Sequence, residues 1–388
     1  MILLFATVDP WLDRAGILAG GLDVHVYRDG AWRILHGLPL YTEPTVAGLL
    51  YTYTPFSTLA FIPIVAVPWA AVNYTGMVFN LLVLFGCILL SWRLLGYRSS
   101  ARVAVVSALL TLTCAFLEPV RTTLFYGQIN LLLMLLVLWD FTRTERSKLR
   151  GIGVGLAAGI KLVPIYFIAQ FIALRQWRSA VTAGATLFAT IAVAWIVLPA
   201  DSREYWTSTF FQSNRIADDM HPSNQSVRGV IAHLTHHPAP MWLWLLIAVP
   251  LALISLVLVA GLYRHGEYLP AVTLAGLTAS AVSPFSWDHH WVWYVPLLVY
   301  LVHRAQTRPL WWLAAAALFV SVGAWTWEYD PNYVVVGLFL FPPWWPLAQV
   351  LINSFVVVYA VVLVGMGVLL LRLRRTETER TDAEPALP

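Results

Sequence analysis

The chain has 388 residues, of which 59% are hydrophobic and only 11% are charged, and its mean hydropathy is +0.71. Soluble domains carry about 25% charged residues, so a soluble protein of this size could not bury so much apolar surface. The net charge of +4 is carried by short basic clusters at the ends of apolar runs, a pattern that sets membrane orientation and argues against a nucleic-acid binder.

Apolar runs of membrane-helix length recur along the whole chain. The first eight residues, Met1–Val8, are too short to cross a hydrocarbon core of about 30 Å, and we interpret them as a truncated first span. Pro55–Ala71 contains two prolines, and Gly151–Leu174 contains a lysine and a proline, so both are expected to be bent or re-entrant helices. The clear runs are Val72–Leu95, Val103–Leu117, Gly127–Phe141, Ala180–Pro199, Met241–Tyr263, Tyr268–Pro284, Trp291–Val302, Pro309–Trp325 and Trp345–Leu371.

The sequence therefore predicts an all-α polytopic membrane protein with about 10–12 transmembrane or re-entrant helices. Residues 1–375 are expected to form a single membrane domain, and the polar tail 376–388 is expected to be disordered and cytoplasmic. The positive-inside rule assigns the basic ends to the cytoplasm. The loops that then face outward, where most of the polar residues gather, are 9–54, 200–240, 285–290 and 326–343.

The first outer loop contains a short amphipathic segment from Asp23 to His36, in which Leu22, Val26 and Tyr27 share one face at helical spacing. Asp23 at its start is either a helix N-cap or a functional carboxylate. Asp29 is the alternative carboxylate in this loop, but its spacing of six residues turns it to a different face.

Two further clusters contain amides. Gln128 and Asn130 open an apolar run, where they either cap a helix at the membrane interface or bind sugar hydroxyls. Asn224 and Gln225 lie in the large outer loop. Lys161 stands within an apolar stretch, where a charge is costly, so it either snorkels to the interface, pairs within the bundle or serves function.

The last cluster reads Trp287, Asp288, His289, His290. A carboxylate beside two histidines suggests a metal, but adjacent residues rarely share one ion, and no helical metal-ligand spacing accompanies them. Hydrogen-bonding or cationic contact with a phosphate is the favoured interpretation, and no metal or cofactor is predicted. A Walker loop, a dinucleotide-binding glycine pattern and a nucleophile elbow are all absent from the sequence.

Together these clusters resemble glycosyltransferase family 87, within the C-superfamily of polytopic membrane glycosyltransferases. The resemblance covers nearly the whole chain, and the motifs occur in the family's order. Thr54 departs from the proline that the family often has there. The matching motifs are Asp23–Tyr27, Gly37–Tyr41, Tyr53–Phe56, Gly127–Asn130, Ile160–Pro164, Asn224–Ser226 and Trp287–His290.

The resemblance implies an inverting α-mannosyltransferase in the plasma membrane. Its donor is polyprenyl-phosphate-mannose, its acceptor is a phosphatidylinositol mannoside or lipoglycan, and its active site is built by loops on the periplasmic face. It also implies that Asp23 is the catalytic base. Four donors are nominated for the leaving phosphate: His289, His290, Arg121 and Lys161. The candidates for sugar binding are Tyr27, Gln128, Asn130, Asn224, Gln225, Trp287 and Asp288.

Three other interpretations remain open. A transferase using another polyprenyl-phosphate sugar fits the same residues. A lipid or sugar transporter predicts ionisable residues at mid-membrane depth, where only Lys161 qualifies. A non-catalytic assembly partner would not need so many amides and acid–base groups on one face.

Overall fold

The computed structural model describes residues 20–383 apart from 213–214, 216 and 326–335. The predicted first span and part of the predicted outer loop 326–343 lie outside the described residues. Within them the chain is helical, with only two isolated β-bridges. The α-helices are α2 (Leu22–Leu35), α3 (Pro55–Phe61), α4 (Val72–Leu94), α5 (Ala101–Cys114), α6 (Glu118–Tyr126), α7 (Asn130–Phe141), α8 (Ile152–Ile160), α9 (Tyr166–Ala173), α10 (Trp177–Val197), α11 (Pro199–Thr207), α12 (Val227–Thr235), α13 (Met241–Arg264), α14 (Tyr268–Val282), α15 (Tyr294–Ala305), α16 (Trp311–Ser321), α17 (Ala348–Leu351) and α18 (Ser354–Ala383).

The predicted all-α polytopic class is confirmed. Among the described residues, four helices are long and apolar enough to cross a membrane, and a fifth crossing results if α6 and α7, bent by 117°, form one broken span. The four are Trp69–Leu94, Trp177–Val197, Met241–Arg264 and Ser354–Glu379.

Several of the apolar runs form shorter or broken helices. Pro55–Ala71 divides into α3 and the 3₁₀ turns η3 (Ile62–Ala66) and η4 (Trp69–Ala71), because proline cannot donate to the helical ladder. At the other end of the chain, α18 continues through residues 376–383, for which disorder was expected. An ion pair between Arg375 and Glu379, 2.9 Å apart and one turn along the helix, favours this extension.

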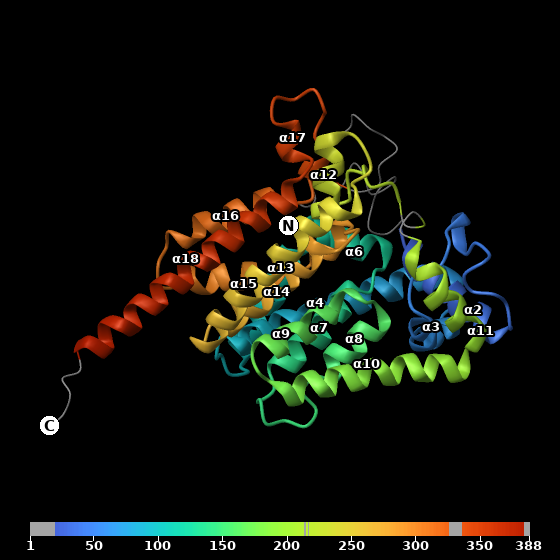
Figure 1. Ribbon diagram of the computed structural model, residues 1–388, viewed down its shortest axis with the longest axis horizontal. Helices are drawn as coiled ribbons and strands as arrows, with labels where there is room; N and C mark the ends of the chain where they lie inside the picture. The colour runs from blue at the N-terminus through green and yellow to red at the C-terminus, as the bar shows by residue number, and fades with distance from the viewer. Residues whose placement is uncertain (1–19, 213–214, 216, 326–335, 384–388) are drawn as a thin grey trace.

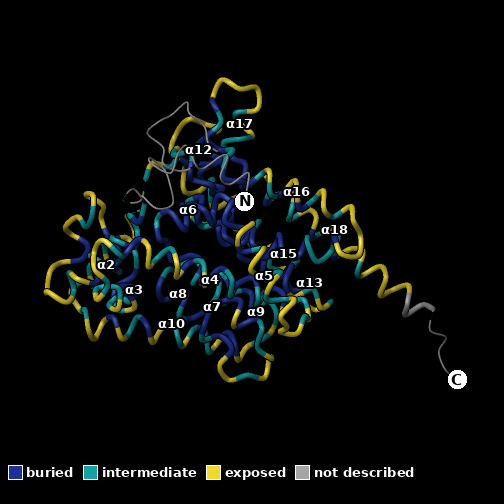
Figure 2. Tube along the Cα trace, turned by 180° about the vertical axis from the view of Figure 1, so that it is seen from behind, coloured by how far each residue is buried: buried dark blue, intermediate teal, exposed yellow. Residues whose placement is uncertain are grey.

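The helices pack around a buried centre, which is dark in Figure 2 and includes α4, α7, α8 and α15. α8 approaches α10 closely because Gly151, Gly155 and Gly159 recur at every fourth residue and face it. A side chain at Gly155 would collide with the backbone of Ala183. This contact fixes the end of α8, which is directly followed by Lys161.

At one end of the molecule α2, α3 and α11 form a group of short helices (Figure 1). The start of α2 contacts α6 and α4, and η8 (Asp288–Trp291) packs on α6. Segments from the first and last thirds of the chain therefore meet near the bend between α6 and α7, and the predicted site residues lie there.

Candidate active site

Asp23 lies in the first turn of α2 but does not cap it. The N-cap is Gly21, whose backbone is left-handed with φ 101°. The Gly21 N–H donates to the Phe125 carbonyl of α6 at 2.6 Å, so the start of α2 is tied to the end of α6. Local helix capping therefore does not account for the aspartate.

Asp23 as a whole residue is partly exposed, whereas its neighbours Val24 and Tyr27 are buried. Burial raises the pKa of Asp23 above its ordinary value, while the positive charges of His289 and Lys161 and a hydrogen bond with Gln128 act in the opposite direction. A carboxylate with a raised pKa is a better proton acceptor, as a general base requires.

Two tyrosines orient the Gln128 amide beside Asp23. The hydroxyls of Tyr27 and Tyr53 donate to Gln128 Oε1 at 2.9 and 3.1 Å, and they lie 2.8 Å from each other. Because the amide oxygen accepts both hydroxyls, the NH₂ group is the one that faces the Asp23 carboxyl.

Gly127 makes the sharp bend between α6 and α7 possible. It ends α6 with φ 71°, a left-handed conformation that suits glycine. A side chain there would lie 2.7 Å from Val24, so glycine also lets α2 approach. The bend leaves Gln128 in the connection and Asn130 at the start of α7. Asn130 donates to the His289 carbonyl at 3.0 Å and accepts from Lys161 at 3.1 Å.

Lys161 follows α8 directly, in an extended conformation that ends the helix. Its ammonium lies 2.8 Å from His290 Nε2 and 5.3 Å from the centre of the Tyr53 ring. An ammonium can only donate, so His290 Nε2 accepts and the ring proton is on Nδ1, which lies 3.5 Å from Ser286 Oγ. Burial lowers the pKa of His290 well below its ordinary value, and the nearby charges of Lys161 and His289 add to this shift. Burial also lowers the pKa of Lys161, to about 7, so any positive charge on this pair resides on Lys161 and is fully present only below neutral pH.

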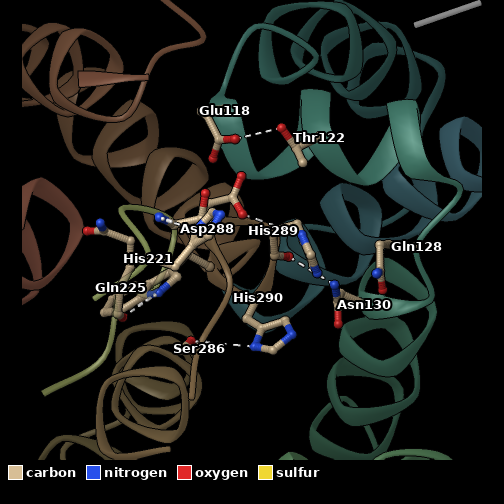
Figure 3. Close-up of polar contacts among 12 residues, drawn as sticks. Glu118, Thr122, Gln128, Asn130, His221, Gln225, Ser286, Asp288, His289 and His290 are labelled. Atoms are coloured by element: carbon tan, nitrogen blue, oxygen red, sulfur yellow. Dashed lines mark hydrogen bonds and ion pairs between the residues drawn. The ribbon is translucent and has the colours of Figure 1, made fainter. Parts of the chain in front are cut away.

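Asp288 and His289 lie beside Glu118 of α6. Figure 3 shows Glu118 and Asp288 directed toward one another from the two elements. His289 Nδ1 is 3.5 Å from Asp288 Oδ1, and within the described ranges neither His289 ring nitrogen has a hydrogen-bond partner. Asp288 and Glu118 are completely buried, whereas Trp287 and His290 are partly exposed. Trp287 and His290 are therefore the accessible residues of this motif.

Asn224 and Gln225 connect the large loop that was predicted to face outward to the segment before η8. Asn224 forms an isolated β-bridge with Trp287, and its side-chain oxygen accepts from Ser226 at 2.9 Å. The Gln225 side chain donates to the Ile352 carbonyl at 2.7 Å and accepts from the Phe355 N–H at 3.2 Å. Both side chains are buried and engaged within the chain. Their predicted role in sugar binding stays a prediction.

The remaining nominated donor, Arg121, is buried on α6, with its guanidinium 4.9 Å from the centre of the Phe125 ring. Asp29 forms an ion pair with Arg33 at 3.1 Å within α2. In the part of the chain that the structure describes, no three His, Cys, Asp or Glu residues are grouped as metal ligands. The metal-free scheme stays a prediction.

The sequence reasoning assigned no role to Tyr53 or Glu118, although both contact the cluster. Tyr53 was visible as part of the motif Tyr53–Phe56. Thr54 in that motif caps α3 and donates to the Gly159 carbonyl at 2.5 Å, next to Lys161. A threonine at this position therefore links the motif to the end of α8.

The partly exposed side chains Asp23, Tyr53, Lys161 and His290 define the accessible part of this cluster. It combines a proton acceptor, a cation and several fixed hydrogen-bond donors. These are the groups that a displacement at a sugar carbon needs, with a base for the incoming hydroxyl and a positive charge for a leaving phosphate.

Comparison with known proteins matches residues 51–284 to the model of glycosyltransferase family 87. A polyprenol-phosphate-mannose-dependent alpha-(1-2)-phosphatidylinositol pentamannoside mannosyltransferase of Mycolicibacterium smegmatis is 33% identical over 291 residues, which cover 74% of this chain and 70% of the relative. A polyprenol-phosphate-mannose-dependent alpha-(1-2)-phosphatidylinositol mannoside mannosyltransferase of the same organism is 31% identical over 334 residues, covering 79% and 75%. An alpha-(1->3)-arabinofuranosyltransferase of Corynebacterium glutamicum is 31% identical over 265 residues, covering 64% and 59%. No solved structure matches the chain.

Proposed function

The chain belongs to glycosyltransferase family 87, and from this premise we propose that it transfers mannose from polyprenyl-phosphate-mannose to a mannosylated lipid. The acceptor is a phosphatidylinositol mannoside or lipoglycan, and the new linkage is α-1,2 on the outer face of the membrane. The names of two similar mycobacterial enzymes support both substrates. The observation that carries the chemistry is the Asp23 carboxyl, on a partly exposed residue, with the Lys161 ammonium close enough to affect its pKa.

In the proposed reaction the Asp23 carboxylate accepts the proton of the acceptor hydroxyl. The hydroxyl oxygen forms a bond to the anomeric carbon as the bond from that carbon to the phosphate oxygen breaks. The polyprenyl phosphate leaves with the bonding electrons, and attack from the opposite side converts a β-linked donor into an α-linked product. Asp23 then releases its proton to water.

Lys161 is the group best suited to the leaving phosphate. Of the two partners in its contact with His290, it is the one that carries the charge, and a cation at the bond that breaks stabilises the departing oxygen. His290 and Asn130 orient its ammonium from two sides. His289 and Arg121 remain phosphate candidates.

Tyr27, Tyr53 and Gln128 are proposed to hold the sugar near Asp23. Their hydroxyl and amide groups already form one hydrogen-bonded set, so little ordering is needed when a sugar binds. Trp287 offers a partly exposed ring against which a sugar face can pack. Asp288 is buried and acts in this scheme through His289.

The test uses the purified full-length protein with polyprenyl-phosphate-mannose and a phosphatidylinositol mannoside acceptor. We expect transfer by wild type, an α-anomeric product by NMR, and a loss of about 10²–10⁴-fold in Asp23→Asn. Asp29→Asn is the matched control, because it removes a carboxylate of the same helix whose ion-pair partner among the described residues is Arg33, which also pairs with Glu43. Asp29→Asn should keep most of the activity.

Polyprenyl-phosphate-arabinose is the competing donor in a parallel reaction, because one relative is an arabinofuranosyltransferase. Transfer of arabinose and no transfer of mannose would overturn the sugar assignment while keeping the transferase. Equal loss in Asp23→Asn and Asp29→Asn would overturn the assignment of Asp23 as the base.

A further inference from the structure

A long apolar groove lies on the side of the molecule formed by α15, α16 and α18, and it shares no residue with the candidate active site. Its volume is about 1020 Å³, at the upper end of ligand pockets in proteins. α16 and α18 lie side by side at its edges (Figure 1). The apolar walls include Leu301, Leu318, Val358, Val362, Met366 and Leu369.

One end of the groove is strongly basic. Arg304, Arg308, Arg372 and Arg375 line it, with Glu379 as the only acidic residue in the lining. Arg375 pairs with Glu379 at 2.9 Å, and Arg304 lies 3.8 Å from Glu267. Arg308 and Arg372 have no acidic partner among the residues that the structure describes. Two guanidinium groups are thus available to an anion at this end.

The groove is long enough to hold the acyl chains of a phospholipid. Its lining rises about 15 Å along α16, from Trp311 to Ser321, and about 33 Å along α18, from Val357 to Glu379, against a hydrocarbon core of about 30 Å. The basic end lies where the chain is rich in arginine, which the positive-inside rule assigns to the cytoplasmic leaflet. The groove therefore combines apolar walls for acyl chains with a cationic end at headgroup depth.

We propose that this groove is a binding site for one anionic phospholipid of the inner leaflet. Its acyl chains lie against α16 and α18, and its phosphate is bound by Arg308 and Arg372. Paired guanidiniums suit a phosphate diester, because each presents several N–H donors in one plane. A second copy of the chain suits the groove less well, because it would place its own basic end against this one. A polyprenyl-phosphate donor also suits it less well, because its phosphate is proposed to bind at Lys161.

The glycine at position 365 provides a way to fill the groove. A side chain there would meet nothing within 4 Å, and Gly365 lines the groove. Gly184 on α10 is equally unobstructed and lies outside the groove. Gly365→Phe and Gly184→Phe therefore form a matched pair that separates occupancy of the groove from general effects on a membrane helix.

The test is native mass spectrometry of the full-length protein in mixed micelles of phosphatidylglycerol and phosphatidylcholine with identical acyl chains. We expect wild type to retain one phosphatidylglycerol in preference to phosphatidylcholine. The double variant Arg308→Gln/Arg372→Gln should lose about tenfold in that preference, since a basic residue near the surface contributes to anionic-lipid binding. Arg374→Gln, an exposed arginine of α18 outside the lining, should keep it.

Gly365→Phe should abolish retention of the lipid, and Gly184→Phe should not. Three outcomes would overturn the proposal: no preference in wild type, an equal loss in Arg374→Gln, or unchanged retention in Gly365→Phe. A dimer that persists when the lipid is removed and disappears in Gly365→Phe would assign the groove to a second copy instead. Mannose transfer by the same variants is measured separately, because the groove and the active site share no residue.

Discussion

The Lys161 ammonium lies 2.8 Å from Nε2 of His290, which connects the end of α8 to the segment that follows α14. Asn130 accepts a second hydrogen bond from the same ammonium at 3.1 Å. Three parts of the chain thus fix the position of one charge. The geometry leaves that charge partly exposed and close to Asp23.

Removing this charge should slow the chemical step. We expect Lys161→Met to lower kcat by about 10²–10³-fold with a smaller effect on KM, because the charge is needed most as the phosphate departs. Lys148, the only other lysine of the chain, is exposed in a distant loop, so Lys148→Met is the control. Steady-state kinetics distinguish the two variants. A rise in KM alone would make Lys161 a residue for ground-state binding.

The acidic limb of the pH–rate profile should report Asp23. Below its pKa the carboxyl is protonated and cannot accept the acceptor's proton, so kcat/KM falls as pH decreases through that pKa. Because burial raises the pKa of Asp23, the limb should lie above the ordinary aspartate pKa of about 3.9. A limb at or below that value would contradict the assignment.

The same shift predicts an effect on stability. A raised pKa in the folded state means that the ionised carboxylate costs stability once pH exceeds the folded pKa. Asp23→Asn should therefore unfold at the same or a higher temperature than wild type at pH 7, even though it is inactive. Thermal unfolding followed by tryptophan fluorescence measures this. A lower unfolding temperature would mean that the carboxylate stabilises the fold.

Gln225 should act on the fold rather than on the sugar. Its side chain bonds to the backbone at Ile352 and Phe355, so Gln225→Ala removes the partner of the partly buried Ile352 carbonyl and of the buried Phe355 N–H. A loss of about 1–3 kcal/mol is expected, visible as a lower unfolding temperature with nearly unchanged KM. A raised KM at unchanged unfolding temperature would instead support the predicted role in sugar binding.

The glycines of α8 give a test of packing. Gly155→Ala adds a methyl group against Ala183 and should destabilise the protein by about 1–3 kcal/mol. Gly184→Ala adds the same group where nothing lies within 4 Å, and alanine is the better helix former. Its unfolding temperature should be unchanged or higher. Equal effects of the two substitutions would remove the argument for close contact between α8 and α10.

The helical class followed from the length of the apolar runs, and the position of α2 followed from hydrophobic spacing; both are local properties of the sequence. The prediction started this helix at Asp23, whereas it begins at Leu22 because Gly21 bonds to Phe125, about a hundred residues away in the chain. Such a tertiary contact leaves no periodic signal in the sequence. The sequence contains the motif Tyr53–Phe56, but the hydrogen bond of the Tyr53 hydroxyl to Gln128 depends on the fold and has no local signal.

Lys161 shows the same limit. A charge in an apolar stretch indicates an unusual residue, but the sequence does not identify its partner, because His290 lies 129 residues further along the chain. The converse holds for Gln225, whose residue type suggested sugar binding. Its hydrogen-bond capacity is used by backbone groups near Ile352 that no local pattern indicates.

The meeting of α2 with the segment after α14 also bears on how the protein is made. Asp23 leaves the ribosome early, yet the histidine that orients its neighbouring cation is among the later residues to be synthesised. A nascent chain inserted only as far as α13 contains the proposed base and the lysine but lacks the histidine that contacts the lysine. Catalytic competence is therefore expected only once the chain has been made past η8, and chains that terminate before it should be inert.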